Sequence, residues 1–166
     1  MKDSAFQAAE PRASDASEGE AVKAPSRRVD QLLTHYGLSH QNPVNERIHF
    51  VAIPLIMLSL LGLLHALHPV AAYGFVAASL VYYARLSSVF FITMSLGSLL
   101  ALSLIKLMGG SVLTVSLAVF AGAWVLQFIG HKIEGKKPSF FEDLQYLWVG
   151  PLFVLSKLFL RLGVRW

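Results

Sequence analysis

The sequence of 166 residues contains no cysteine. This absence excludes disulfide bonds, thiolate zinc sites, iron–sulfur clusters and a cysteine nucleophile. Charge is also scarce: Asp, Glu, Lys and Arg make up 14% of the chain, whereas an average soluble domain carries about 25%. Because hydrophobic residues make up 55%, the composition argues against a soluble globular protein.

The few charged residues lie near the two ends of the chain. Between Ile48 and His131 the only Lys, Arg, Asp or Glu residues are Arg85 and Lys106. An apolar region of this length is typical of a membrane domain. The basic residues that give the net charge of +4 are therefore interpreted as membrane topology signals. We expect the protein to interact with a lipid bilayer and not with nucleic acid.

Short polar or helix-breaking segments divide the apolar region into four stretches. A membrane-spanning helix needs about 20 apolar residues, and all the stretches except the second are long enough. We therefore predict an all-α fold: a polytopic membrane helical bundle with about four transmembrane helices. The stretches cover roughly residues 48–67, 70–84, 88–105 and 111–130.

The segments outside this region predict two further features. Residues 1–26 have few large apolar side chains, so we expect a disordered N-terminal tail followed by a membrane-embedded helical domain, residues 27–166. This domain should open with a short amphipathic helix over 27–38 and a polar segment over 39–49.

The C-terminal segment should be an interfacial or re-entrant helix. Gly150-Pro151 should break it in two, and beyond the break Lys157, Arg161 and Arg165 are spaced four residues apart. They share one helix face, opposite leucine and phenylalanine side chains. Such a helix suits the surface of an anionic leaflet.

Lys and Arg residues are most frequent before the first stretch and after the fourth. With four spans, both termini lie on the same side of the membrane, and the excess of Lys and Arg predicts that this side is cytoplasmic. Lys106 is the exception, because it lies at the opposite side. We expect a bacterial inner membrane rather than the endoplasmic reticulum.

Three of the six histidines are candidates for a metal site. His40 and His49 lie just before, or at the start of, the first span, and His131 lies at the end of the fourth. The predicted topology places all three at the cytoplasmic membrane surface, and converging imidazoles favour a metal ion. His65 is about 24 Å of helix from His49, so it and His68 should lie elsewhere.

Polar residues accompany these histidines at helical spacing. Asn45 precedes His49 by four residues, Gln127 precedes His131 by four, and Glu134 follows it by three. Glu134 would be a ligand, a group that orients His131, or a partner of a nearby Lys or Arg. Fe(II), Zn(II) and Mn(II) all accept such ligands, and open positions suit non-haem iron and dioxygen.

Two other functions remain open from the residues alone. A b-type haem electron carrier would use facing histidines such as His49 and His131 as axial ligands. A non-enzymatic, lipid-binding membrane scaffold would bind no stoichiometric metal.

Two motifs resemble the 2-hydroxy fatty acid dioxygenases, a family of small membrane proteins. They are HQNPVNERIHFVAIP, His40–Pro54, and QFIGHKIEGKKPSFFEDL, Gln127–Leu144, with a weaker match at GPLFVL, Gly150–Leu155. The resemblance covers about residues 30–160. It implies an Fe(II)-dependent enzyme that uses dioxygen to shorten a 2-hydroxy fatty acid by one carbon, an α-oxidation step. It also implies iron ligands at His40, His49 and His131, with Asn45 and Glu134 as ligands or supporting catalytic groups.

Overall fold

The computed structural model describes residues 27–135 and 146–166, where every regular element is a helix. The predicted all-α class is confirmed for this part of the chain. The predicted disordered tail, residues 1–26, lies outside the described residues. The elements are α1 (Arg28–Gly37), α2 (Pro43–Leu67), α3 (Pro69–Ala84), α4 (Ser88–Met108), the 3-10 turn η1 (Gly109–Ser111), α5 (Val112–Glu134) and α7 (Val149–Leu162).

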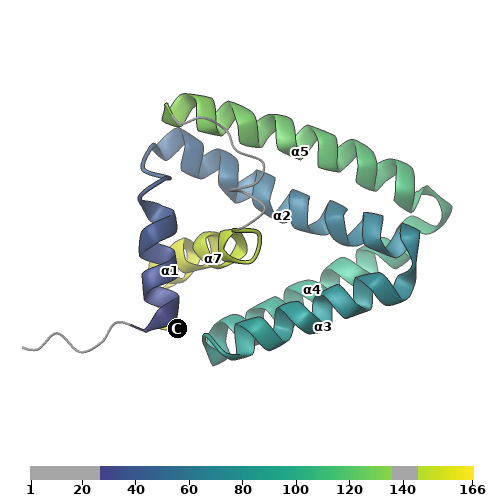
Figure 1. The fold of residues 1–166 in the computed structure, drawn as a ribbon, viewed down its shortest axis with the longest axis horizontal. Helices are drawn as coiled ribbons and strands as arrows, with labels where there is room; N and C mark the ends of the chain where they lie inside the picture. Colours follow the sequence, from purple (N-terminus) through teal and green to yellow (C-terminus); the bar gives the residue numbers. More distant parts are fainter. Residues whose placement is uncertain (1–26, 136–145) are drawn as a thin grey trace, which may run out of the picture.

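The helices form two long pairs and a short end group (Figure 1). Helices α2 and α5 make the most extensive pair, and α3 and α4 form a hairpin beside them. Helices α2 and α5 approach closely at Gly62, where an added Cβ would overlap Ser116. The absence of a side chain at Gly62 permits this packing. Helix α1 and helix α7 pack together near the start of α2.

The helix boundaries follow local chemistry. His68 and Ser87 cap α3 and α4 by accepting a hydrogen bond from the backbone two residues later, and Gly109 ends α4 with a φ of 54°. These ends match the predicted breaks. The start of α2 does not, because the helix already begins at Pro43, where Asn42 Oδ1 accepts from the Val44 amide.

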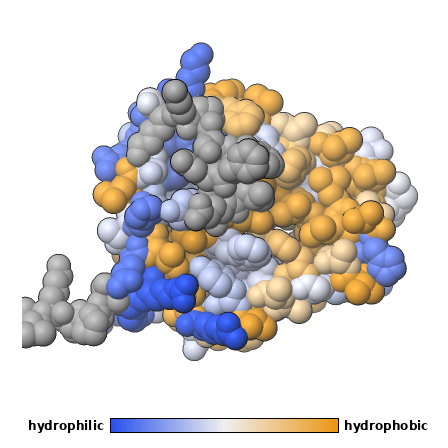
Figure 2. Space-filling model, viewed as in Figure 1, coloured by the Kyte–Doolittle hydropathy of each residue, from blue (hydrophilic) through white to orange (hydrophobic). Residues whose placement is uncertain are grey.

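Among the described residues, two helical stretches are long and apolar enough to cross a membrane: Pro43–Leu67, and Ser88–Glu134, which holds α4, η1 and α5. Large apolar side chains remain exposed on them, and Figure 2 shows hydrophobic surface away from the hydrophilic end near α1. These features suggest membrane association. The four-span arrangement, the cytoplasmic termini and the type of membrane stay predictions. Examples of the exposed side chains are Leu96, Leu99, Leu107, Leu113 and Leu117.

The C-terminal helix differs from the expectation. Helix α7 begins at Val149, so Gly150 and Pro151 lie in its first turn rather than at a break. Its buried apolar side chains pack on protein, in a cluster with Val29, Tyr83 and Phe90. The apolar face expected on a lipid leaflet is thus largely covered by the other helices.

Candidate metal centre

Three buried histidines meet where α1, α2 and α5 come together. His40 lies in the link between α1 and α2, His49 in the second turn of α2, and His131 near the end of α5. One ligand atom of each lies within 4.8 Å of the others. The ring centroids are 4.5 Å apart for His40–His49, 5.2 Å for His49–His131 and 5.6 Å for His40–His131.

Backbone carbonyls orient two of the rings. His40 Nδ1 is 2.8 Å from the Tyr36 carbonyl oxygen, and His49 Nδ1 is 3.0 Å from that of Asn45. A carbonyl only accepts hydrogen bonds, so each neutral ring is assigned its proton at Nδ1 and its lone pair at Nε2. This arrangement is common for histidines that bind metals.

The two Nε2 atoms of His40 and His49 are only 3.1 Å apart. Two lone pairs at this distance would repel each other, and either a proton shared as N–H···N or a metal ion bound by both nitrogens removes this repulsion. Nitrogens that each lie about 2.1 Å from one metal ion would be about 3 Å apart. The donor set and its spacing therefore fit a bound metal ion.

Aromatic side chains hold His40 in place, although it lies outside the helices. The Tyr36 ring stacks on the His40 ring, with 4.1 Å between the ring centroids. The ring centroid of Phe153, on α7, lies 5.7 Å from that of His40 and 5.0 Å from that of Tyr36. Sequence reasoning missed both aromatic residues. Their helical spacing is the same as that of ordinary core residues, so it gave no signal of a metal site.

Glu134 connects the end of α5 to the start of α2. Its carboxylate oxygens accept hydrogen bonds from the backbone of Gln41 at 2.8 Å, from the backbone of Asn42 at 2.9 Å and from Asn45 Nδ2 at 3.0 Å. Glu134 is not part of the three-histidine group. Glu134 therefore has a role that the sequence did not indicate: its carboxylate fixes the link between α1 and α2 that contains His40.

Asn45 lies between this carboxylate and the metal centre. It is fully buried; its side chain donates to Glu134, and its carbonyl oxygen contacts His49 Nδ1. Gly130 provides the space, because a Cβ there would overlap Asn45 Oδ1 and lie 3.4 Å from His49 Cε1. In the sequence, Gly130 was noted only as one residue of the second motif, Gln127–Leu144.

The other three histidines lie elsewhere. His35 Nδ1 contacts the Tyr146 hydroxyl at 3.0 Å. His65 lies edge-on to Tyr73, and His68 caps α3. The structure therefore brings together the three predicted histidines and leaves these apart.

Comparison with known proteins identifies the family. The family described as 2-hydroxy-palmitic acid dioxygenase Mpo1-like matches residues 26–162, which include all three clustered histidines. The chain belongs to this family. This membership confirms the resemblance found in the two histidine motifs.

One relative within the Mpo1-like family is the 2-hydroxy-palmitic acid dioxygenase MPO1 of Saccharomyces cerevisiae. It is 29% identical over 138 residues, which cover 79% of each chain. No solved structure matches the chain. The family name suggests an oxidoreductase that acts on a 2-hydroxy fatty acid.

Proposed function

We propose that the protein is an Fe(II)-dependent membrane dioxygenase that shortens a 2-hydroxy fatty acid by one carbon. Membership of the Mpo1-like family supports the reaction class, and the buried cluster of three histidines supports a metal. In the proposed reaction the C1–C2 bond breaks, C1 leaves as carbon dioxide and C2 becomes the new carboxyl carbon. One dioxygen molecule takes up the four electrons released, and one water forms, so no further reductant is needed.

The histidines would hold the iron, His40 and His49 through their Nε2 atoms. When bound, Fe(II) would supply the redox centre for dioxygen chemistry. With only three protein ligands, the ion would be able to interact with the substrate and with dioxygen as well.

The surrounding residues prepare this site rather than react. Carbonyl oxygens of Tyr36 and Asn45 hold the Nδ1 protons. The Glu134 carboxylate holds the backbone beside His40. We therefore propose Asn45 and Glu134 as positioning residues, in place of the catalytic role that the resemblance allowed.

One distance favours a non-haem metal over the haem alternative. His40 Nε2 lies 3.1 Å from His49 Nε2. A haem held by His49 Nε2 would have to displace the His40 ring from this position.

The test is mass spectrometry of the products from detergent-purified, Fe(II)-loaded protein given 2-hydroxypalmitate under air. We expect a fatty acid one carbon shorter from wild type and from His35→Ala, which alters an exposed histidine outside the centre. His131→Ala should give no product and bind less iron, because one of three ligands is lost.

Each other result contradicts a specific part of the proposal. Turnover by His131→Ala at the wild-type rate would remove it from the ligand set. Stoichiometric iron without product would exclude this substrate. Neither iron nor product would favour the lipid-binding scaffold, and a Soret band would favour the haem carrier.

A further inference from the structure

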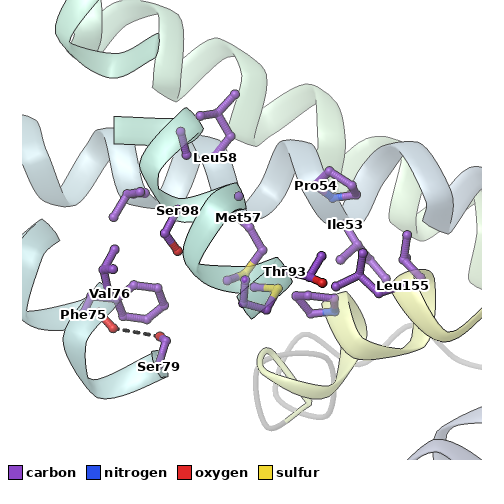
Figure 3. Close-up of a pocket in the computed structure, with 16 residues that line it drawn as sticks. Ile53, Pro54, Met57, Leu58, Phe75, Val76, Ser79, Thr93, Ser98 and Leu155 are labelled. Carbon is purple, nitrogen blue, oxygen red and sulfur yellow. Dashed lines mark hydrogen bonds between the residues drawn. The ribbon is translucent and has the colours of Figure 1, made fainter. Parts of the chain in front are cut away.

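A large apolar cavity lies between α2, α3, α4 and α7 (Figure 3). Its volume is about 270 Å³, near the lower limit of pockets that bind small molecules, about 300 Å³. The hydroxyls of Ser79 and Thr93 donate to carbonyl oxygens of their own helices. They therefore do not require a polar ligand, and the other walls are mostly apolar. Lining residues include Leu58, Phe75, Val76, Met94, Gly97 and Leu155.

A second, smaller cavity of about 30 Å³ lies beside the metal centre. Tyr36, which stacks on His40, and Gln127, one helical turn before His131, both line it. Ile53 and Met57 line both cavities. These two side chains of α2 therefore form the wall between the metal end and the apolar end, and the methionine is flexible enough to move aside.

Gln127 provides an independent sign of a polar ligand in the smaller cavity. The residue is 3% exposed, and its Oε1 has no hydrogen-bond partner among the residues that the structure describes. Burying such an acceptor without a partner is unfavourable. A ligand hydroxyl in this cavity would supply the missing donor.

We propose that the acyl chain of the substrate occupies the large cavity. Its polar end passes between Ile53 and Met57 into the smaller cavity, where Gln127 Oε1 accepts a hydrogen bond from the 2-hydroxyl group. This inference rests on the proposed function for the identity of the head group. It places the acyl chain against the apolar walls of this half-open cavity rather than in the bulk of the surrounding bilayer, so the shape of the cavity bears on which chains are accepted.

Gly97→Leu tests the position of the acyl chain. Gly97 lines the cavity and a Cβ there meets no described atom within 4 Å, so a leucine can be accommodated at the cavity wall, where it would narrow the space for an acyl chain. We expect the kcat/KM for 2-hydroxypalmitate to fall about tenfold or more, while that for 2-hydroxyoctanoate stays near wild type. Gly122→Leu is the matched control, because Gly122 also has open space around it but does not line the cavity. It should leave both values unchanged.

Palmitate binding to iron-free protein in lipid nanodiscs separates this proposal from the reaction. We expect wild type and Gly122→Leu to bind palmitate and Gly97→Leu to bind it about tenfold more weakly. This pattern without turnover by any variant would support the cavity and reject the reaction. Equal palmitate binding and equal turnover in both glycine variants would reject the cavity and leave the reaction in place. Ala101→Leu, at another point of the lining, replaces Gly97→Leu if that variant does not fold.

Gln127→Leu tests the polar end. It should bind palmitate as wild type does but lose its preference for 2-hydroxypalmitate over palmitate, by about tenfold. An unchanged preference would reject the hydrogen bond from Gln127.

Discussion

At the scale of single residues, Gly130 shows how little space the metal centre leaves. The glycine lies one residue before His131 on α5 and faces Asn45 and His49 on α2. Any side chain there would push against the Asn45 amide, which donates to Glu134. The absence of a Cβ is thus a condition for the approach of the two helices that carry His49 and His131.

Gly130→Ala should therefore destabilise the protein by about 1–3 kcal/mol through overpacking and lower its iron content. Gly122→Ala is the control on the same helix, since its Cβ would meet no described atom within 4 Å. Alanine is the better helix former there, by about 0.5–1 kcal/mol. Thermal unfolding and bound iron per chain, measured in detergent, check both variants. Equal stability and equal iron content in Gly130→Ala and Gly122→Ala would show that the Asn45 side chain moves aside without a loss of stability.

At the scale of elements, the link between α1 and α2 is held by a residue from α5. The carboxylate of Glu134 accepts backbone hydrogen bonds from Gln41 and Asn42, directly after His40. It thus fixes a non-helical segment relative to two helices.

Glu134→Gln should weaken metal binding about 10–100-fold, as is typical when groups that support metal ligands are lost. An amide offers one acceptor oxygen in place of the two that the carboxylate uses. Glu46→Gln is the matched control, because the Glu46 carboxylate pairs with Lys157 at 3.0 Å, and the one bond from Glu46 to the link is from its backbone amide to Asn42, which the substitution keeps. Competition for Fe(II) with a coloured chelator measures both affinities. A lower kcat at unchanged affinity would instead return Glu134 to a catalytic role.

The helices could be predicted where a local signal ends them, as at His68-Pro69 and Gly109. The start of α2 was placed too late because its first turns are polar, although Asn42 followed by Pro43 is a local start signal. They are helical because Asn42 caps them and because Asn45 and His49 are buried between helices. A hydropathy pattern contains no information on burial of this kind.

The candidate site could be predicted only in part for the same reason. Topology and motif spacing pointed to the three histidines. The stacking of Tyr36 on His40 and the backbone partners of Glu134 depend on packing between segments far apart in sequence. Neither residue type nor local spacing specifies such contacts.

At the scale of the whole molecule, the arrangement predicts which loops share a side of the membrane. The α2–α3 and α4–α5 turns lie at one end of the hairpins, and the α3–α4 turn lies toward the other (Figure 1). With four spans and cytoplasmic termini, the first two turns would face away from the cytoplasm.

Single introduced cysteines test this topology, and the cysteine-free sequence makes each label unique. Leu67→Cys and Gly110→Cys should react with a membrane-impermeant maleimide in intact bacterial spheroplasts. Arg85→Cys should react only after lysis. The reverse pattern would invert the orientation, and labelling of all three in intact spheroplasts would exclude four spans.

The wide separation of the histidines along the chain has a consequence for synthesis. His40 and His49 leave the ribosome early, whereas His131 follows only after α3, α4 and most of α5. A nascent chain that has not completed α5 holds two of the three proposed ligands and lacks the third. A metal ion bound by all three histidines would close a long loop, and closing a long loop restricts the unfolded chain more than closing a short one. Under the proposed function, the metal would thus stabilise chains that have completed α5 over shorter nascent chains.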